Sequence, residues 1–591
     1  MSNIRLRHRD ATGGARKQPR PGLGHGSWPG WLAGLKSLAA RLPWPHTLFA
    51  AASVAKILVM GYHFGTWDHT LYLPLLKHSV DPTLYPSDPF LALGAAHTAF
   101  FWDLFAPAYR AGVLELAVFV AYVLVTYLTS WSIWSLSQAL FDNRLAAAVS
   151  VAALILPHIG LVGLSQVGFS LVAWIAVLPF TLWALTWYLR GRYLAAFGLL
   201  GVLYNFNALS VNFALGLLVL ASLADLRRVG VRNLAGGLAI FVVAAAPVFI
   251  WRAANGPLDF SLRPEWVSAL RRGINVGLYQ VFGTQPEVLI YTASFAAMVA
   301  LFVSAWRLAP ARASRPLSAA RAWMAGVVLV ALAAWVAAVW LPVTFVIELQ
   351  LGRIGVYATV LSMVYCAHYL ARADQAGRLG RAEFGALALA LCLPPFAFLT
   401  LGLWGISRLV RSARWRPVLV AGLALTVTGA SAALAASQGA WDPRVQVGAA
   451  HDDWYAAQVW ARDNTPKAAV FMTPPQEQGF YTPSWRVFSE RGTVATLDDL
   501  MDTGNTPGYF DVWQPRFEAV APGALARFRG DIVENATLTA QAYNGLTDAQ
   551  VLAVAGRYEA GYLVAAQPHQ RPWPVAYANE GFIIYNLRGA R

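Results

Sequence analysis

A series of long apolar runs between residues 46 and 438 constrains the fold of this chain more than any other feature. A helix needs about 20 apolar residues to cross the hydrocarbon core of a membrane. From Asp442 onward such runs stop and ordinary soluble composition takes over. The pattern predicts a polytopic α-helical membrane protein of about 11–13 transmembrane segments. The runs cover 46–64, 112–140, 144–163, 167–189, 193–207, 209–226, 233–251, 286–306, 322–341, 351–371, 384–410 and 416–436.

The same pattern divides the chain into three regions. They are a basic tail (1–45), a transmembrane region (46–438) whose long first outer loop spans 65–110, and a C-terminal domain (440–591). The overall composition agrees with this division, because 57% of the residues are hydrophobic and only 13% are charged. Soluble domains carry about 25% charged residues.

The basic residues predict how the chain is oriented. Lys and Arg concentrate in the tail and in short loops such as 226–232 and 307–321, and in membrane proteins such residues stay on the cytoplasmic side. We therefore expect a cytoplasmic tail in a bacterial inner (cytoplasmic) membrane and an extracytoplasmic C-terminal domain. The same distribution argues against a nucleic-acid partner, despite the net charge of +15.

Pro394-Pro395 interrupts the run 384–410, and proline breaks a helix by removing a backbone donor. Two half-spans forming a hairpin would return the basic loop that follows to the cytoplasm. The alternative is one kinked helix and a cytoplasmic C-terminal domain.

Several polar residues lie in or directly after the first apolar run. Lys56 shares a helix face with Ser53 and His63. A lysine at the bilayer centre costs roughly 2.5–3.5 kcal/mol on insertion scales, so its face should line a polar interior. If the helix continues, that face leads over ~18 Å to Asp68 and His69. The alternative is a lysine that pairs structurally with another helix.

The first outer loop also carries motifs that resemble a known superfamily. The loop motifs are Asp68-His69, Tyr72-Leu73-Pro74 and Asp81-Pro82-Thr83-Leu84-Tyr85-Pro86-Ser87-Asp88-Pro89-Phe90, and two later motifs are Tyr204-Asn205-Phe206-Asn207 and Trp460-Ala461-Arg462-Asp463-Asn464-Thr465-Pro466. The segment 91–109, apolar but interrupted by Asp103 and Pro107, is predicted to be an interfacial helix. The acidic residue beyond the first span, the proline-rich turns and the two later motifs together resemble the GT-C membrane glycosyltransferases.

This resemblance implies sugar transfer from a polyprenyl-phosphate carrier to an acceptor hydroxyl. Asp68 matches the general base by position, with His69 beside it. The departing phosphate needs cationic stabilisation, for which Arg353 is the first candidate. The expected substrate-binding residues are Arg353, Gln350, Glu348, Lys56, Arg263, Arg271 and Arg272.

The resemblance also implies the partners. They are a lipid-linked sugar donor, a glycan, lipid or protein acceptor, and membrane lipids. GT-C enzymes often carry two adjacent acidic residues in this loop, whereas this chain has Asp68-His69. We therefore name no metal ligand, and a divalent cation stays an open alternative as cofactor.

The C-terminal domain has the pattern of a small α/β fold. Helices are predicted at 452–464 and 548–557, and strands at 468–472, 486–488, 561–565 and 581–587. The loop 474–486 could close over an acceptor or be a structural turn.

Two other functions compete with glycosyl transfer. One is transport or flipping of a lipid-linked substrate, and the other is a non-catalytic role in envelope assembly. A cavity that passes through both leaflets would favour transport.

Overall fold

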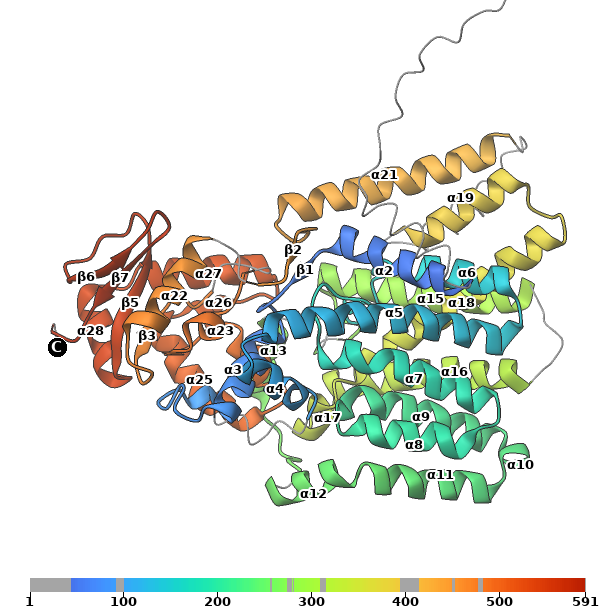
Figure 1. Ribbon diagram of the computed structural model, residues 1–591, viewed down its shortest axis with the longest axis horizontal. Helices are drawn as coiled ribbons and strands as arrows, with labels where there is room; N and C mark the ends of the chain where they lie inside the picture. The colour runs from blue at the N-terminus through green and yellow to red at the C-terminus, as the bar shows by residue number, and fades with distance from the viewer. Residues whose placement is uncertain are drawn as a thin grey trace, which may run out of the picture. The chain divides into compact units, whose positions relative to one another are not determined.

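The computed structural model describes residues 44–591 except 92–99, 256–257, 274–278, 280, 309–314, 394–413, 449–451, 477–481 and 590–591. Leu48–Arg591 forms one compact unit. Its membrane region is a bundle of apolar helices that lie side by side, and its C-terminal domain holds a five-stranded sheet (Figure 1).

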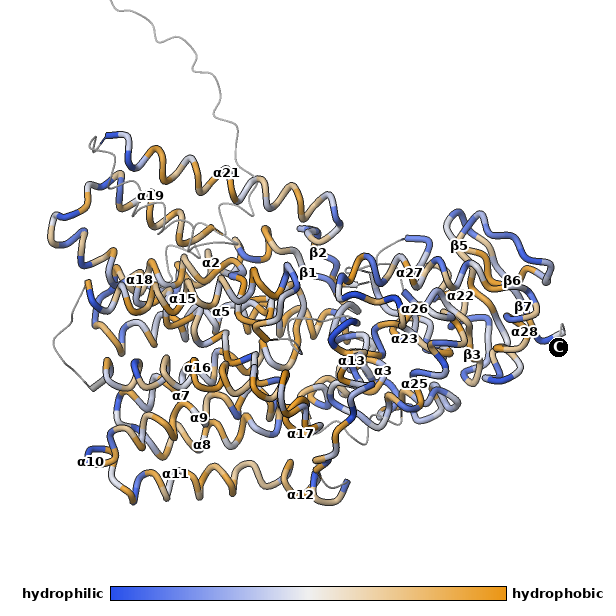
Figure 2. Tube along the Cα trace, turned by 180° about the vertical axis from the view of Figure 1, so that it is seen from behind, coloured by the Kyte–Doolittle hydropathy of each residue, from blue (hydrophilic) through white to orange (hydrophobic). Residues whose placement is uncertain are grey.

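The apolar helices follow the predicted runs closely. They are α2 (His46–Met60), α5 (Leu114–Phe141), α6 (Arg144–Ala153), α7 (Ala173–Leu189), α8 (Tyr193–Tyr204), α9 (Ala208–Ala224), α11 (Val231–Ala244), α12 (Ala246–Asn255), α15 (Pro286–Leu308), α16 (Arg315–Val339), α18 (Gly355–Gln375), α19 (Arg381–Cys392) and α21 (Trp415–Ser437). Apolar residues dominate along the helices, and polar residues gather in the loops and in the C-terminal domain (Figure 2).

Among the described residues, five helices are long and apolar enough to cross a membrane, or six if α11 and α12, bent by 58°, form one span. Five further apolar helices have only 10–17 residues, including α2, α6 and α8. The prediction of a multi-pass α-helical membrane protein is confirmed. Several predicted runs are nevertheless helical over only part of their length. The predicted hairpin lies outside the described residues, because α19 ends at Cys392 and residues 394–413 are not described.

The predicted run 144–163 is helical only as far as Ala153, the last residue of α6. Buried side chains replace the helical hydrogen bonds in the irregular segment that follows. Gln166 donates to the carbonyls of Leu154 and Leu156, and Ser294 of α15 donates to that of Ile159. Such irregular backbone is tolerated at membrane depth only where protein groups satisfy it.

Strand β1 (Tyr62–His63) lies directly before the first outer loop, which contains α3 (His69–Val80), η2 (Trp102–Phe105) and α4 (Ala106–Arg110). Part of the predicted interfacial helix 91–109 lies in residues that are not described, and its remaining part forms the two short helices. On the same side of the bundle, α13 (Pro264–Arg272), α17 (Thr344–Glu348) and η3 (Leu351–Ile354) connect longer helices, whereas α10 (Leu226–Val229) belongs to a basic loop.

The C-terminal domain is an α/β domain, as predicted. Its sheet has the strand order β4-β3-β5-β7-β6, with β3 parallel to both neighbours and β7 antiparallel to β5 and β6. The strands are β3 (Val470–Met472), β4 (Gly492–Thr493), β5 (Ala560–Ala566), β6 (Val575–Ala578) and β7 (Phe582–Asn586), and the helices are α22 (Asp453–Asn464), α23 (Trp485–Ser489), α24 (Asp499–Asp502), α25 (Pro507–Val520), α26 (Ala524–Arg527), α27 (Ile532–Asn544) and α28 (Asp548–Arg557).

One predicted strand is wrong. Residues 486–488 belong to α23, which is fully buried, so the alternation between a buried and an exposed face that would mark a strand is absent. The helix places Arg486 against Asp88 and Asp499, with nitrogen–oxygen distances of 2.7 Å to each.

The C-terminal domain packs directly on the first outer loop. Strand β1 pairs in parallel with β2 (Val445–Gln446), and Lys77 Nζ of α3 lies 2.8 Å from Glu490 Oε1. The indole of Trp266 in α13 donates to the backbone oxygen of Thr503 at 3.1 Å. The loop and the domain therefore form continuous walls on the same side of the helical bundle.

Candidate functional site

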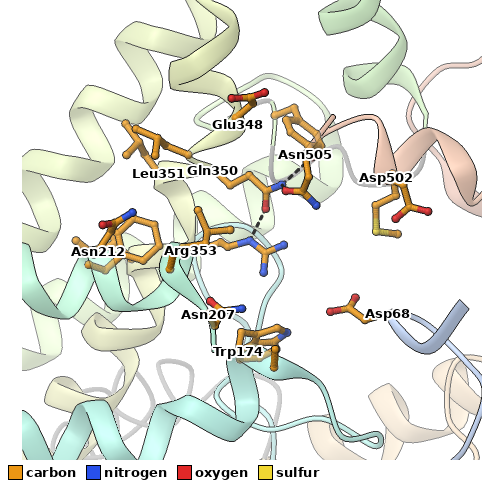
Figure 3. Close-up of a pocket in the computed structure, with 18 of the residues that line it drawn as sticks. Asp68, Trp174, Asn207, Asn212, Glu348, Gln350, Leu351, Arg353, Asp502 and Asn505 are labelled. Carbon is orange, nitrogen blue, oxygen red and sulfur yellow. Dashed lines mark hydrogen bonds between the residues drawn. The ribbon is translucent and has the colours of Figure 1, made fainter. Parts of the chain in front are cut away.

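A cavity of about 1720 Å³ opens where the first outer loop, the helical bundle and the C-terminal domain meet. Asp68, Trp174, Asn207 and Arg353 from the membrane region line one part of it, and Asp502 and Asn505 from the C-terminal domain face them (Figure 3).

Asp68 stands directly before the first turn of α3. Its carboxylate lines the cavity and makes no side-chain hydrogen bond to the described residues. Trp67, which precedes it, has a φ of 55°, a left-handed conformation that is uncommon for a large side chain. Burial raises the pKa of Asp68 above its usual value, and the nearby Arg353 guanidinium counteracts part of that rise. A carboxylate with a raised pKa is a stronger base than an ordinary aspartate.

His69 holds the loop in place instead of lining the cavity. The backbone N–H of Gly65 donates to His69 Nδ1 at 3.0 Å, and Nε2 donates to the carbonyl oxygen of Leu171 at 2.6 Å. Burial lowers the pKa of His69 to about 4, so the ring is neutral at physiological pH. Both nitrogens are engaged, which leaves His69 as a positioning group for Asp68.

Gln350 connects Arg353 to the C-terminal domain. Arg353 Nε donates to Gln350 Oε1 at 2.5 Å, and Gln350 Nε2 donates to the Tyr279 hydroxyl and to Asn505 Oδ1 at 3.1 and 3.3 Å. Gln350 has a φ of 44°, again in the left-handed region. Such strained residues concentrate at functional sites, where surrounding contacts hold them in place. The network leaves the terminal nitrogens of Arg353 facing the cavity (Figure 3).

Asp502, the last residue of α24, brings a second carboxyl group to the cavity. It is only 8% exposed. Burial raises its pKa well above the usual value, and the neighbouring carboxylates Asp499, Asp498 and Asp68 raise it further. Asp502 therefore carries a proton more readily than an ordinary aspartate does.

The structure brings together only some of the residues selected from the sequence. Asp68, Glu348, Gln350 and Arg353 line the cavity. Lys56 does not, because α2 directs its amine to the Thr126 hydroxyl at 3.2 Å and to the face of the Tyr122 ring. This agrees with the alternative of structural pairing with another helix.

Three of the four arginines between residues 252 and 284, namely Arg263, Arg271 and Arg272, also lie outside the cavity, whereas Arg252 lines it. Arg263 pairs with Asp259 and with Asp511 of the C-terminal domain. Arg271 and Arg272 donate to backbone carbonyls, those of Tyr279 and Ser268 respectively. These contacts fix the segment against its surroundings. The expectation from the sequence that the three arginines bind substrate is therefore not supported by their positions.

An apolar groove continues the cavity along one face of α9. Leu209, Phe213, Gly216, Leu220 and Leu223 line it, which corresponds to ~21 Å along the helix axis. Gly326, Leu329 and Val330 of α16 form the facing wall. Asn207 lies on the side of Arg353 that faces Asp68, and Asn212 lies beyond it, between Leu209 and Phe213 on α9 (Figure 3). The cavity therefore has a polar head and, beyond Asn212, an apolar tail.

Sequence reasoning missed Asp502, Asn505, Trp174 and Arg252 as cavity residues. Asp502 and Asn505 lie more than 400 residues from Asp68, and nothing in their local sequence signals that they meet it. A run of three carboxylates, Asp498, Asp499 and Asp502, was the one available signal.

Among the described residues, no group of three or more His, Cys, Asp or Glu side chains is placed to hold a metal ion. Asp68 and Asp502 offer two carboxylates without a third ligand of these types.

Comparisons with known proteins give limited matches. Residues 452–520 match the model of a domain of unknown function, DUF6798. No curated protein matches the sequence. Among solved structures, the chain is similar to the crystal structure of ArnT from Cupriavidus metallidurans in the apo state, with 11% identity and a TM-score of 0.41 over 94% of this chain and 97% of that chain.

Proposed function

We propose that this membrane protein is a glycosyltransferase that moves a sugar from a polyprenyl-phosphate carrier to an acceptor hydroxyl, with Asp68 as general base. The observation that carries this proposal is the shape of the cavity. A guanidinium and an unpaired carboxylate share its polar head, and an apolar groove leads away from them along α9 and α16. A lipid phosphate with a long isoprenoid chain has the same division into charged head and apolar tail.

The chemistry follows from these positions. The acceptor oxygen attacks the anomeric carbon of the donor sugar, its proton passes to Asp68, and the bond between that carbon and the phosphate oxygen breaks. The electron pair leaves with the lipid phosphate, whose charge Arg353 stabilises through its free terminal nitrogens. Arg252, which also lines the cavity, is a second cation for the same phosphate.

Transport is less well supported by the shape of the groove. Its tail is lined by leucine, valine and glycine with no charged residue, so it offers no polar path for a sugar head group across the bilayer. A purely structural role leaves Asp68 without an explanation, because a carboxylate that is desolvated and lacks a hydrogen-bond partner lowers stability.

The membrane orientation belongs to the same proposal. A cytoplasmic basic tail would place Asp68 and the C-terminal domain together on the outer face of the inner membrane, because the loop and the domain are in contact. The donor lipid and the acceptor would then meet on that face.

A comparison of Asp68→Asn with Asp81→Asn in cells tests the proposal. Asp81 lies in the same loop but pairs with Lys467 on the surface, with both side chains substantially exposed. With both variants inserted at wild-type levels, Asp68→Asn should abolish one envelope glycan modification that a deletion strain also lacks, and Asp81→Asn should retain it. Normal modification in Asp68→Asn cells would contradict the proposed function.

A further inference from the structure

The C-terminal domain contributes an unpaired carboxyl group to the cavity. Among the described residues, no side chain or backbone group forms a hydrogen bond with the carboxylate of Asp502. The residue as a whole is only 8% exposed. Its carboxylate opens into the cavity, so a bound molecule can supply the hydrogen-bond partner that the protein does not. Figure 3 shows its carboxylate facing the same space as Asp68.

The residues on both sides of Asp502 are firmly held. Asp499 Oδ1 accepts from Arg486 at 2.7 Å, the backbone oxygen of Thr503 accepts from Trp266, and Asn505 accepts from Gln350. The segment is therefore fixed at three points around Asp502. Its side chain is positioned by the protein and left without a partner on the cavity side.

The positions of Asp68 and Asp502 in the cavity indicate different functions for their carboxyl groups. Arg353 and the groove on α9 lie in the membrane region, and this end would hold the lipid phosphate. Asp502 lies on the opposite wall, which the C-terminal domain forms. An acceptor that enters from the aqueous side would contact this wall, and its reacting hydroxyl would lie beside Asp68.

We propose that Asp502 binds the acceptor as a neutral carboxyl group, by a hydrogen bond to a hydroxyl of the acceptor near the one that reacts. The C-terminal domain thereby supplies part of acceptor recognition and not only a cover for the cavity. This inference rests on the proposed glycosyl transfer. The raised pKa of Asp502 agrees with the neutral form, because a second negative charge beside Asp68 is disfavoured.

The test uses full-length protein and material from a strain that lacks it. The anionic lipid fraction of that strain should contain the unused polyprenyl-phosphate donor, and its remaining envelope should contain the unmodified acceptor. Purified variants are mixed with both, and transfer is followed by mass spectrometry. Binding of undecaprenyl phosphate is measured separately as a probe of the donor end.

Asp502→Asn keeps a neutral hydrogen-bonding group of the same shape and should retain transfer within about threefold of wild type. Asp502→Ala removes the group and should reduce transfer about 10- to 100-fold, as expected when a bound hydroxyl loses its partner. Both variants should bind undecaprenyl phosphate as wild type does. Asp548→Asn is the control, since Asp548 forms a surface pair with Arg571 in the same domain, outside the cavity.

The melting temperature gives a readout that does not depend on transfer. Removal of an unpartnered buried carboxyl group should leave the melting temperature equal to or above that of wild type in both Asp502 variants. A large decrease would show that Asp502 is needed for folding and would overturn the proposal.

Three other results would also overturn it. If Asp502→Asn were as inactive as Asp68→Asn, the charge of Asp502 would be required. If Asp502→Ala were fully active, Asp502 would not contact the acceptor. If transfer by wild type depended on Mn²⁺ or Mg²⁺ and Asp502→Asn abolished that dependence, Asp502 would be a metal ligand. Full activity of Asp68→Asn, in contrast, would mean that the proposed function itself fails.

Discussion

Arg486 Nε lies 2.7 Å from Asp88 Oδ2, and this contact joins the C-terminal domain to the first outer loop across 398 positions of the sequence. Both side chains are almost completely buried, 2% and 0% exposed respectively. Asp499 accepts from Nη1 of the same guanidinium at 2.7 Å. One arginine therefore pairs with two carboxylates and fixes the wall of the cavity that carries Asp502.

Replacement of Arg486 by Gln should strongly destabilise the protein. It leaves Asp88 and Asp499 buried without their cation, which typically costs about 3–5 kcal/mol. Thermal unfolding of the purified protein, combined with limited proteolysis of the C-terminal domain, measures the loss. Arg571→Gln, which removes a surface pair, should cost at most about 1 kcal/mol. Equal stability of the two variants would contradict the structural role given to Arg486.

Arg353→Gln tests the phosphate end of the cavity. Loss of a hydrogen-bonded cation facing an anion should weaken undecaprenyl phosphate binding about 10- to 100-fold, in line with the energy of charge-assisted hydrogen bonds. Arg263→Gln is the control, because Arg263 pairs with Asp259 and Asp511 outside the cavity. Isothermal titration calorimetry in detergent would measure the affinity of both variants for undecaprenyl phosphate. If the two variants lost affinity equally, Arg353 would not be the phosphate ligand.

The apolar groove predicts a matched pair of glycine substitutions. A Cβ added at Gly216, which lines the groove on α9, or at Gly422 on α21 meets no atom within 4 Å. Gly216→Leu should fill the groove and weaken undecaprenyl phosphate binding at least about tenfold. Gly422→Leu should leave binding unchanged. Both replace glycine within a helix by a better helix former, so neither should reduce stability. Unchanged lipid binding by Gly216→Leu would place the isoprenoid chain elsewhere.

The raised pKa of Asp68 determines the sign of the pH dependence. A general base must be ionised, so transfer should fall as the pH decreases through the pKa of Asp68, which lies above the ordinary aspartate value. Arg353 lowers this pKa, so the acidic limb of the kcat/KM profile should move to higher pH in Arg353→Gln. Measuring kcat/KM against pH for wild type and for Arg353→Gln tests the direction of this shift. A shift to lower pH would exclude Asp68 as the titrating group.

The sequence was sufficient to predict the helices, because hydrophobic runs and basic loops are local properties. The runs 112–140 and 286–306, for example, correspond to α5 and α15 within a few residues. Of the four strands predicted in the C-terminal domain, one was wrong, at 486–488, where a short buried segment has no periodicity that separates strand from helix. The strands β4 and β6 were not predicted.

The site was only half predictable, for a physical reason. Asp68 follows a span directly, and Arg353 begins another, so both could be selected from local patterns. Asp502 reaches the cavity through contacts between distant segments, chiefly Arg486 with Asp88 and Trp266 with Thr503. Lys56 was expected along a polar face, yet the neighbouring helix α5 satisfies it with Thr126. Local sequence does not encode such pairings.

The most direct measurement is the rate at which purified Asp68→Asn releases polyprenyl phosphate from the donor in the presence of acceptor. Asparagine keeps the size of the side chain but cannot take a proton, so the rate should fall about 10²- to 10⁴-fold while undecaprenyl phosphate still binds with wild-type affinity. Release at the wild-type rate, with binding intact, would contradict the claim that Asp68 activates the acceptor.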